Sequence, residues 1–169
     1  MAVIEAFLGK RVEIPEDSRY HIKQGLWVIS ENEILVFGLT KPALILAGRI
    51  NDLDWLVAEG QRVSAGESIV FAITGKILYI ETPSDGTVQF NSAAKKNPLL
   101  IRDDPYNRGW LFKIIPAGRV DDEWKKFVTA REYIDSLQSS EGFKNPKGLK
   151  GGVSGICKAV YLGIREQKI

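Results

Sequence analysis

Short apolar runs rich in β-branched residues alternate with polar turns over most of this chain. The runs that predict β-strands cover residues 26–30, 34–39, 50–57, 68–73, 77–80 and 87–90. The polar turns at 31–33 and 74–76 each join two such runs, which indicates hairpins. Residues 59–71 and 84–90 echo one another, since each holds a glycine turn, a valine and a returning strand. Two such halves packed face to face would form a small, flattened β-barrel.

Two segments carry helical signals. Thr40 can cap a short helix, whose first turn tolerates Pro42 and which Gly48 closes. Residues 120–137 place apolar side chains at roughly helical spacing, and the acids at the start of this segment suit a helix N-terminus. We expect an interruption of this helix near Thr129. Strands and short helices together predict a mainly β protein.

The same signals divide the chain into three parts. Residues 1–19 are predicted to be a lead-in that ends in a turn or an extended entry around Pro15. Residues 20–139 form the main domain, which is long enough to bury a core. Residues 140–169 are predicted to be a basic linker followed by a C-terminal extension. Apolar residues recur there at helical spacing and predict a last short helix.

Charge is concentrated towards the C-terminal end. Residues 143–169 contain six lysines or arginines and one glutamate, a net charge of +5, which leaves −3 for residues 1–142 of a chain with a total of +2. Such a segment can serve an acidic partner, a nucleic acid or a membrane surface. Because only Phe143 and Tyr161 lie among the basic residues, we expect no nucleic-acid partner and favour a solvated segment.

The numbers of cysteines and histidines and the lengths of the apolar runs exclude several classes of protein. A single cysteine, Cys157, excludes an intrachain disulfide framework, and a reducing cytoplasm is the expected location. One cysteine and one histidine also exclude the usual zinc site. No apolar run is long enough to span a membrane, and we expect no secretory signal at the start of the chain. Without a phosphate-binding loop, nucleophile elbow or metal constellation, we expect neither a metal site nor a catalytic residue.

A set of motifs between about Ile14 and Leu137 is specific in its order and spacing. The motifs are Tyr20-His21 before Trp27-Val28, residues 36–40 (VFGLT) before a short helix, Glu59-Gly60, Ala65-Gly66-Glu67, residues 82–86 (TPSDG), Asn91, Pro98-Leu99, Asp104-Pro105-Tyr106 and Gly109-Trp110-Leu111. On these residues the chain resembles the glycine cleavage system H protein, within the biotinyl/lipoyl attachment superfamily. The resemblance implies a lipoyl-type barrel-sandwich hybrid of two small antiparallel sheets, with short helices and a C-terminal helical extension.

The resemblance also implies a function that is not enzymatic. Proteins of this family carry lipoate on a lysine. The lipoyl group collects an aminomethyl group from a glycine decarboxylase, delivers it to an aminomethyltransferase and is reoxidised by dihydrolipoyl dehydrogenase. The dithiolane supplies the chemistry, and the protein supplies its position. The partners implied by the resemblance are these three enzymes and a lipoate-protein ligase.

The attachment hairpin departs from the family pattern by one position. The family lysine lies eight residues before the proline that ends the hairpin, and Gly75 holds this position ahead of Pro83. Lys76 follows one place later, and Ala72 stands where the family has an acidic residue. Because glycine admits positive φ at an apex, a tighter turn could still leave Lys76 at the tip.

Two interpretations of this hairpin follow. In the one we favour, Lys76 is an ordinary turn lysine, lipoate is absent, and the chain is a divergent paralogue that binds partner proteins. In the alternative, Lys76 carries lipoate, and the chain is a true carrier that shuttles an aminomethyl or other group. If the lipoyl arm is lost, Phe71 and Ile73 beside the tip could form a docking patch, although strand core is the expected role of each.

Further polar side chains are expected to be structural. His21 could serve in acid-base work. Without a nucleophile or a second histidine, we expect a structural residue with satisfied hydrogen bonds. Asp103 and Asp104 could form a carboxylate pair, but a turn before Pro105 explains them better.

Two aromatic residues and the cysteine are also expected to be structural. Tyr106 and Trp110 are predicted to be packing residues. Cys157 could be a reactive thiol, because the neighbouring Lys158 can lower its pKa. A small buried apolar residue is its expected role.

Overall fold

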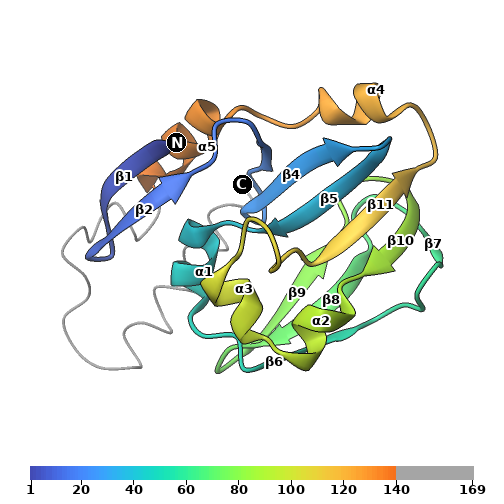
Figure 1. The fold of residues 1–169 in the computed structure, drawn as a ribbon, viewed down its shortest axis with the longest axis horizontal. Coiled ribbons are helices and arrows are strands. Elements are labelled where there is room, and N and C mark those ends of the chain that lie inside the picture. The colour runs from blue at the N-terminus through green and yellow to red at the C-terminus, as the bar shows by residue number, and fades with distance from the viewer. Residues whose placement is uncertain (140–169) are drawn as a thin grey trace.

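The computed structural model describes residues 1–139, in which β-strands are joined by short helices (Figure 1). The strands are β1 (Ala2–Phe7), β2 (Lys10–Ile14), β3 (Arg19–His21), β4 (Leu26–Glu31), β5 (Ile34–Leu39), β6 (Asp52–Trp55), β7 (Arg62–Val63), β8 (Ser68–Ile73), β9 (Ile77–Glu81), β10 (Gly86–Phe90) and β11 (Phe112–Pro116). The helices are α1 (Lys41–Ala47), α2 (Ser92–Lys96), α3 (Leu99–Asp103), α4 (Val120–Trp124), α5 (Ala130–Ser136) and the 3₁₀ helix η1 (Leu137–Ser139). Within this range, no helix is long and apolar enough to cross a membrane.

The strands form three antiparallel sheets. The largest has the order β3-β4-β5-β11-β10-β7, the second has the order β6-β8-β9, and β1 pairs with β2 in a separate hairpin. In Figure 1 the three-stranded sheet lies below the strands of the six-stranded sheet, and the β1-β2 hairpin lies at the left end beside α5. The predicted fold class, a mainly β sandwich of antiparallel sheets with short helices, is confirmed.

The main core lies between the two larger sheets. Leu26 and Val28 of β4 point into it, because alternate residues of a strand share a face. Phe37 of β5 stacks on Phe112 of β11, with ring centroids 4.9 Å apart. The three-stranded sheet contributes Leu53, Ile69, Val70, Ala72 and Ile80. All of these side chains are buried, so the two sheets are held together chiefly by apolar contact.

A second core covers the opposite face of β4 and β5. Trp27 and Val36 point to this side. The β1-β2 hairpin and the C-terminal helices cover them with Ile4, Phe7, Val12, Ile14, Tyr133 and Leu137. Tyr20 of β3 stacks on Tyr133, with ring centroids 4.9 Å apart. Both faces of this part of the sheet are therefore buried. This explains why the first three residues of β4 and nearly all of β5 are apolar without alternation.

Trp27 links the central strands to the loop after α3. Its indole Nε1 donates a buried hydrogen bond of 2.8 Å to the Pro105 carbonyl. Gly38 lies directly opposite Trp27 in the β4-β5 register. A Cβ atom on Gly38 would approach the indole ring to 2.5 Å, so only glycine leaves room for Trp27.

The motif residues Asn91 and Gly109 stabilise the fold. Asn91 caps α2, and its Nδ2 donates to the carbonyls of Arg108 and Trp110 at 2.9 and 2.7 Å. A Cβ atom on Gly109 would lie 2.5 Å from the Leu100 carbonyl oxygen. These motif residues shape the loop between α3 and β11 and bring no reactive group to the surface.

The predicted caps are confirmed. Thr40 Oγ1 accepts a hydrogen bond of 3.2 Å from the Ala43 N–H, and Gly48 ends α1 with a φ of +79°. The interruption expected near Thr129 is also present. Thr129 is the N-cap of α5 and forms a capping box with Glu132, so α4 and α5 are separate helices.

The hairpin β1-β2 and the helices α2 and α3 go beyond what the sequence predicts. The lead-in of residues 1–19 contains β1 and β2, joined by a turn in which Leu8 and Gly9 have φ values of +48° and +79°. The division of the chain at residues 20 and 139 stays a prediction. The helix expected in 140–169 lies outside the described residues.

Candidate functional site

The connection between β8 and β9 is the hairpin that the sequence singles out. Ile73 and Ile77 are its last paired residues, so Thr74, Gly75 and Lys76 form the tip. The Thr74 N–H donates to the Lys76 carbonyl at 2.9 Å and closes the turn. Gly75 stands in the middle of the tip with a φ of +109°. Both sequence-predicted residues, Gly75 and Lys76, are exposed and adjacent there.

Gln24 braces the base of this hairpin. Its Nε2 donates to the Glu81 carbonyl at 2.8 Å, and its Oε1 accepts from the Glu81 N–H at 2.6 Å. The side-chain amide of Gln24 thereby bonds both backbone groups of Glu81, as the backbone of a neighbouring strand would. Lys23 adds an ion pair of 3.1 Å to the Glu81 carboxylate. No sequence pattern points to Gln24, because a glutamine in a turn does not identify its partner.

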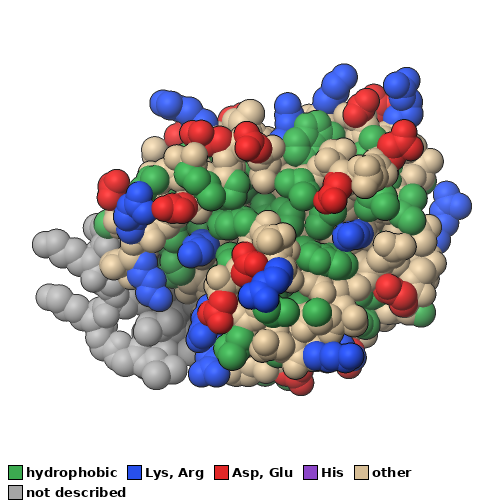
Figure 2. Space-filling view, viewed as in Figure 1, with side chains coloured by type: hydrophobic (Ala, Val, Ile, Leu, Met, Phe, Trp, Pro, Cys, Tyr) green, Lys and Arg blue, Asp and Glu red, His purple; other side chains and the backbone are tan. Residues whose placement is uncertain are grey.

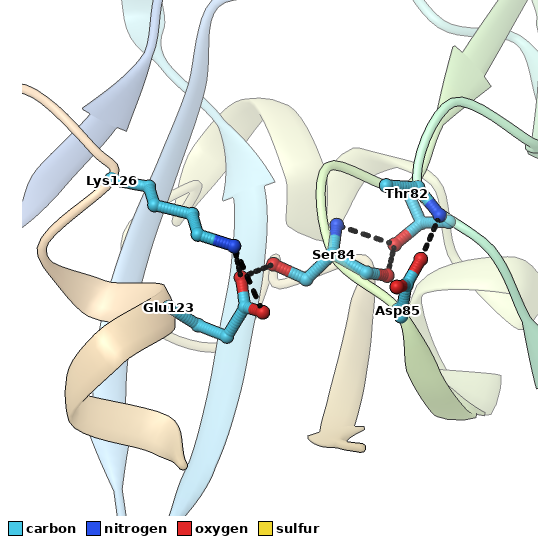
Figure 3. A network of polar contacts seen from close by, with 6 residues as sticks. Thr82, Ser84, Asp85, Glu123 and Lys126 are labelled. Carbon is cyan, nitrogen blue, oxygen red and sulfur yellow. Dashed lines mark hydrogen bonds and ion pairs between the residues drawn. The ribbon is translucent and has the colours of Figure 1, made fainter. Parts of the chain in front are cut away.

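A polar network fixes the chain just after β9 (Figure 3). The buried Thr82 Oγ1 donates to the Ser84 carbonyl at 2.7 Å, and Ser84 Oγ donates to the Glu123 carboxylate at 3.4 Å. Lys126 pairs with the same carboxylate at 3.2 Å. In Figure 3 these side chains connect the hairpin exit to α4. The TPSDG motif is thus a structural support for the hairpin.

The outward face of the three-stranded sheet is apolar next to the tip. Ile73, Ile77 and Tyr79 expose 39%, 59% and 55% of their surface. Ile73 pairs with Ile77 and Phe71 pairs with Tyr79, so these four side chains share one face. We call these four residues the hairpin patch. The expected core role is wrong for Ile73, which lies at the exposed end of β8, and Phe71 is only half-buried.

Two aspartates border the hairpin patch. Asp52 lies opposite Ile73 and Asp54 lies opposite Phe71, which places both carboxylates on the outer face. Lys95 of α2 pairs with Asp54 at 2.5 Å, and this hydrogen bond lowers the pKa of the Asp54 carboxyl. Asp52 is exposed. The face is therefore apolar at its centre and acidic along the β6 edge.

His21 is structural, but its hydrogen bonds are incomplete. Its ring meets Phe127 edge-on, with centroids 6.3 Å apart. Its Nδ1 is buried and has no hydrogen-bond partner in the part of the chain that the structure describes. Burial lowers the pKa of His21 to about 4; Lys23 acts in the same direction, and Glu81 opposes both. The prediction of a satisfied histidine is wrong, because the ring is packed against an aromatic side chain that offers no acceptor or donor.

Asp103 and Asp104 form no carboxylate pair for catalysis. Asp103 ends α3 and pairs with Arg102 at 3.0 Å. Asp104 is the C-cap of α3 and pairs with Arg108 at 3.2 Å, while its carbonyl accepts from the Gly109 N–H at 2.8 Å. The turn predicted at this point is confirmed.

Tyr106 and Trp110 are packing residues, as predicted. The Tyr106 hydroxyl accepts from the Lys41 N–H at 3.0 Å and donates to the Glu13 carbonyl at 3.2 Å. Trp110 packs on the second core, and the Lys113 ammonium lies 4.7 Å from its ring centroid. Cys157 lies outside the described residues.

The hairpin is suited to attachment or docking rather than to catalysis. Among residues 1–139, no group of three histidine, cysteine, aspartate or glutamate side chains is placed to hold a metal ion. The group with chemistry of its own at the tip is the Lys76 amine, carried on a base that Gln24 braces. A two-sheet sandwich that presents one tight, exposed hairpin is the architecture of a carrier-type domain.

Comparison with known proteins gives the family. The family model described as Glycine cleavage H-protein matches residues 18–140. The chain is 35% identical over 151 residues to glycine cleavage system H protein 5 of Aquifex aeolicus, which covers 83% of this chain and 95% of that protein. It is 29% identical over 140 residues to the glycine cleavage system H protein of Bacteroides fragilis, with 79% and 96% covered.

A solved structure agrees with these relatives. The crystal structure of a glycine cleavage system H protein from Mycobacterium marinum matches with a TM-score of 0.61 and 28% sequence identity, covering 72% of this chain and 97% of that one. The chain belongs to the glycine cleavage H-protein family. The resemblance drawn from the sequence motifs is confirmed, and so is the lipoyl-type sandwich fold.

Family membership defines the general mode of action. Proteins of this family are carriers without catalytic activity of their own, so this chain is not itself an enzyme. The family carries lipoate on a lysine and acts through protein partners. In this chain, the hairpin at residues 74–76 is therefore the candidate site for lipoate attachment and for binding of a partner protein.

Proposed function

We propose that this chain is an unmodified member of its family, which binds a partner protein through the hairpin patch and carries no lipoate. The observation that carries this proposal is Gly75, which stands at the position expected for the family lysine and has a φ of +109°. Residues with a Cβ atom rarely adopt this backbone conformation. The tip is therefore shaped for glycine where a carrier would need lysine.

The composition of the outer face supports docking of a protein. Exposed apolar side chains that lie side by side mark interaction sites, and Ile77 and Tyr79 are each more than half exposed. Asp52 adds negative charge along the edge, whereas the charge of Asp54 is balanced by Lys95. A partner surface with an apolar centre and a basic rim would complement this face.

The partner is sought first among the enzymes that the family serves. Glycine decarboxylase, aminomethyltransferase and dihydrolipoyl dehydrogenase are the first proteins to test, in the cytoplasm that the single cysteine predicts. An adaptor of this kind would contribute its surface alone, since nothing at its tip would take part in group transfer.

Two matched substitutions test the docking surface. Ile77→Asp places a charge in the hairpin patch, and Ile115→Asp makes the same change at an exposed strand position on β11. Each variant is titrated with the three purified enzymes. We expect wild type and Ile115→Asp to bind one of them equally, and Ile77→Asp to bind at least about tenfold more weakly. Equal binding by both variants, or no binding by wild type, would contradict the proposal.

A second candidate function, lipoate carriage on Lys76, is favoured by a separate observation. Lys76 is exposed at the tip, one place from the expected position, and the Thr74–Lys76 hydrogen bond fixes its backbone. Because Lys76 is a lysine on an exposed hairpin tip, the residues present fit attachment. When bound, lipoate supplies redox and group-transfer chemistry through its dithiolane. A lipoate-protein ligase would then be a further partner.

A ligase assay separates the two candidates. Purified lipoate-protein ligase is supplied with lipoate, ATP and the full chain, and the product mass is measured. The unmodified proposal predicts no change in mass. The carrier alternative predicts one lipoyl addition that Lys76→Arg abolishes, while Lys96→Arg, at an exposed lysine of α2, leaves it in place.

A further inference from the structure

We infer that a cavity between the N-terminal hairpin and α1 binds a small amphiphilic anion, with a short apolar chain and a carboxylate or phosphate head. The cavity has a volume of about 460 Å³. Pockets for small molecules commonly have volumes of this order. The inference is independent of the proposed function, because none of the hairpin patch residues lines this cavity.

The rim of the cavity is basic. The cationic residues that line it are Lys10, Arg11, Lys41, Arg49 and Arg102, and none of its described lining residues is acidic. Arg11 pairs with Glu13 at 2.9 Å and Arg102 pairs with Asp103 at 3.0 Å. The other three cations form no ion pair within residues 1–139. In Figure 2, several basic side chains lie at the end of the molecule where β2 and α1 lie, with acidic side chains between them. The three cations without an ion pair in this range, Lys10, Lys41 and Arg49, attract an anion.

The floor of the cavity is apolar. It is formed by Leu8, Val12, Leu44, Ile45 and Ile50. Leu8 lies in the β1-β2 turn with a φ of +48°, a conformation that leucine rarely adopts. Asparagine or glycine would suit this turn better. A leucine is therefore held on the cavity wall at a conformational cost, which a ligand with an apolar chain would offset.

The two walls are held together by a defined contact. The Tyr106 hydroxyl bonds both to the Glu13 carbonyl of β2 and to the Lys41 N–H at the start of α1. The cavity is therefore formed before any ligand arrives. Residues 1–17 lie outside the range that the family match covers, and they supply Leu8, Lys10, Arg11 and Val12. The site thus depends on a hairpin that lies outside the region that the family model matches.

The arrangement selects a ligand with two unlike ends. Inorganic phosphate would meet the cations and leave the apolar floor open to water. A neutral alkyl compound would cover the floor and leave the cations without a counter-ion. A medium-length alkyl anion satisfies both, and its head group would lie near Lys41 and Arg49, which have no ion-pair partner among the described residues.

Titration calorimetry on the full chain tests this assignment. The probes are octanoate, octyl phosphate, the neutral analogue octanamide and inorganic phosphate. We expect at least one octyl anion to bind saturably, and octanamide and inorganic phosphate to bind at least about tenfold more weakly. The stronger of the two octyl anions identifies the head group. Added salt should weaken the binding of the anion, because screening reduces charge attraction.

A matched pair of variants ties the binding to the cavity. Arg49→Gln removes an exposed cation of the rim, and Arg62→Gln makes the same change at an exposed residue of β7 that does not line the cavity. We expect about tenfold weaker binding for Arg49→Gln and unchanged binding for Arg62→Gln. Absence of saturable anion binding, octanamide binding as tightly as the anions, or equal effects of the two variants would overturn the inference.

Discussion

The side chain of Gln24 and the backbone of Glu81 form a two-bond clamp, with distances of 2.8 and 2.6 Å, beneath the β8-β9 hairpin. Gln24 follows β3 of the six-stranded sheet, and Glu81 ends β9 of the three-stranded sheet. The clamp therefore joins the two sheets at the base of the candidate site. It explains how a narrow hairpin can present its tip on a firm support.

Gln24→Ala should loosen this support. The substitution removes both hydrogen bonds and leaves the Glu81 N–H and carbonyl without these partners. We expect a loss of about 1–2 kcal/mol in the free energy of unfolding and faster hydrogen exchange at the β9 amides. Urea denaturation and amide exchange measure these effects. Gln138→Ala, at an exposed residue of η1, is the control and should change neither quantity; a β9 exchange rate unaltered by Gln24→Ala would contradict the clamp.

Gly75→Lys should restore a lysine at the expected family position at a cost in stability. Gly75 has a φ of +109°, which disfavours any side chain with a Cβ atom. We expect a loss of about 1–2 kcal/mol by thermal or urea denaturation. Gly118→Lys is the control, because a Cβ atom there meets nothing within 4 Å. A Gly75→Lys protein as stable as Gly118→Lys would show that the tip accepts lysine readily.

Gly38→Ala should disturb the centre of the six-stranded sheet. The added Cβ would lie 2.5 Å from the buried indole of Trp27, which is itself fixed by the bond to Pro105. Overpacking of this kind typically costs about 1–3 kcal/mol. Urea denaturation measures the loss, and the near-ultraviolet circular dichroism of Trp27 reports the displaced ring. Gly118→Ala should be neutral, and a neutral Gly38→Ala would mean that the strands can move apart at no cost.

His21 should make stability fall on the acid side of neutrality. Its pKa is lowered from 6.5 to about 4 on folding, so the unfolded chain binds the proton more readily between these values. The contribution is complete above about pH 6.5 and is lost as the pH falls towards 4. Between pH 7 and pH 5 we expect a loss of about 1–2 kcal/mol. His21→Gln, which cannot titrate, should show a smaller loss between the same two pH values, and an equal loss would rule out this origin.

Local signals were sufficient for most of the fold. Thr40, Gly48 and Thr129 act within one helical turn of their own position, so their capping roles follow from the sequence alone. The β1-β2 turn gave no such signal, because Leu8 takes a positive φ that sequence patterns reserve for glycine or asparagine. The helices α2 and α3 have five residues each, too few for a periodic pattern to appear.

The site was predictable in position but not in its surroundings. The turn at 74–76 and the offset between Gly75 and Lys76 are visible in the chain itself. The clamp by Gln24 and the buried, unpartnered Nδ1 of His21 arise from contacts between distant segments. Exposure of Ile77 and Tyr79 could not be foreseen either, since the continuous apolar run of residues 77–80 does not indicate which of its faces meets solvent.

The intact mass of the full chain purified from its native host tests the central claim most directly. The account predicts the mass of the unmodified polypeptide as the main species. A species heavier by one lipoyl group, mapped by peptide sequencing to Lys76, would contradict it and establish this chain as a lipoyl carrier.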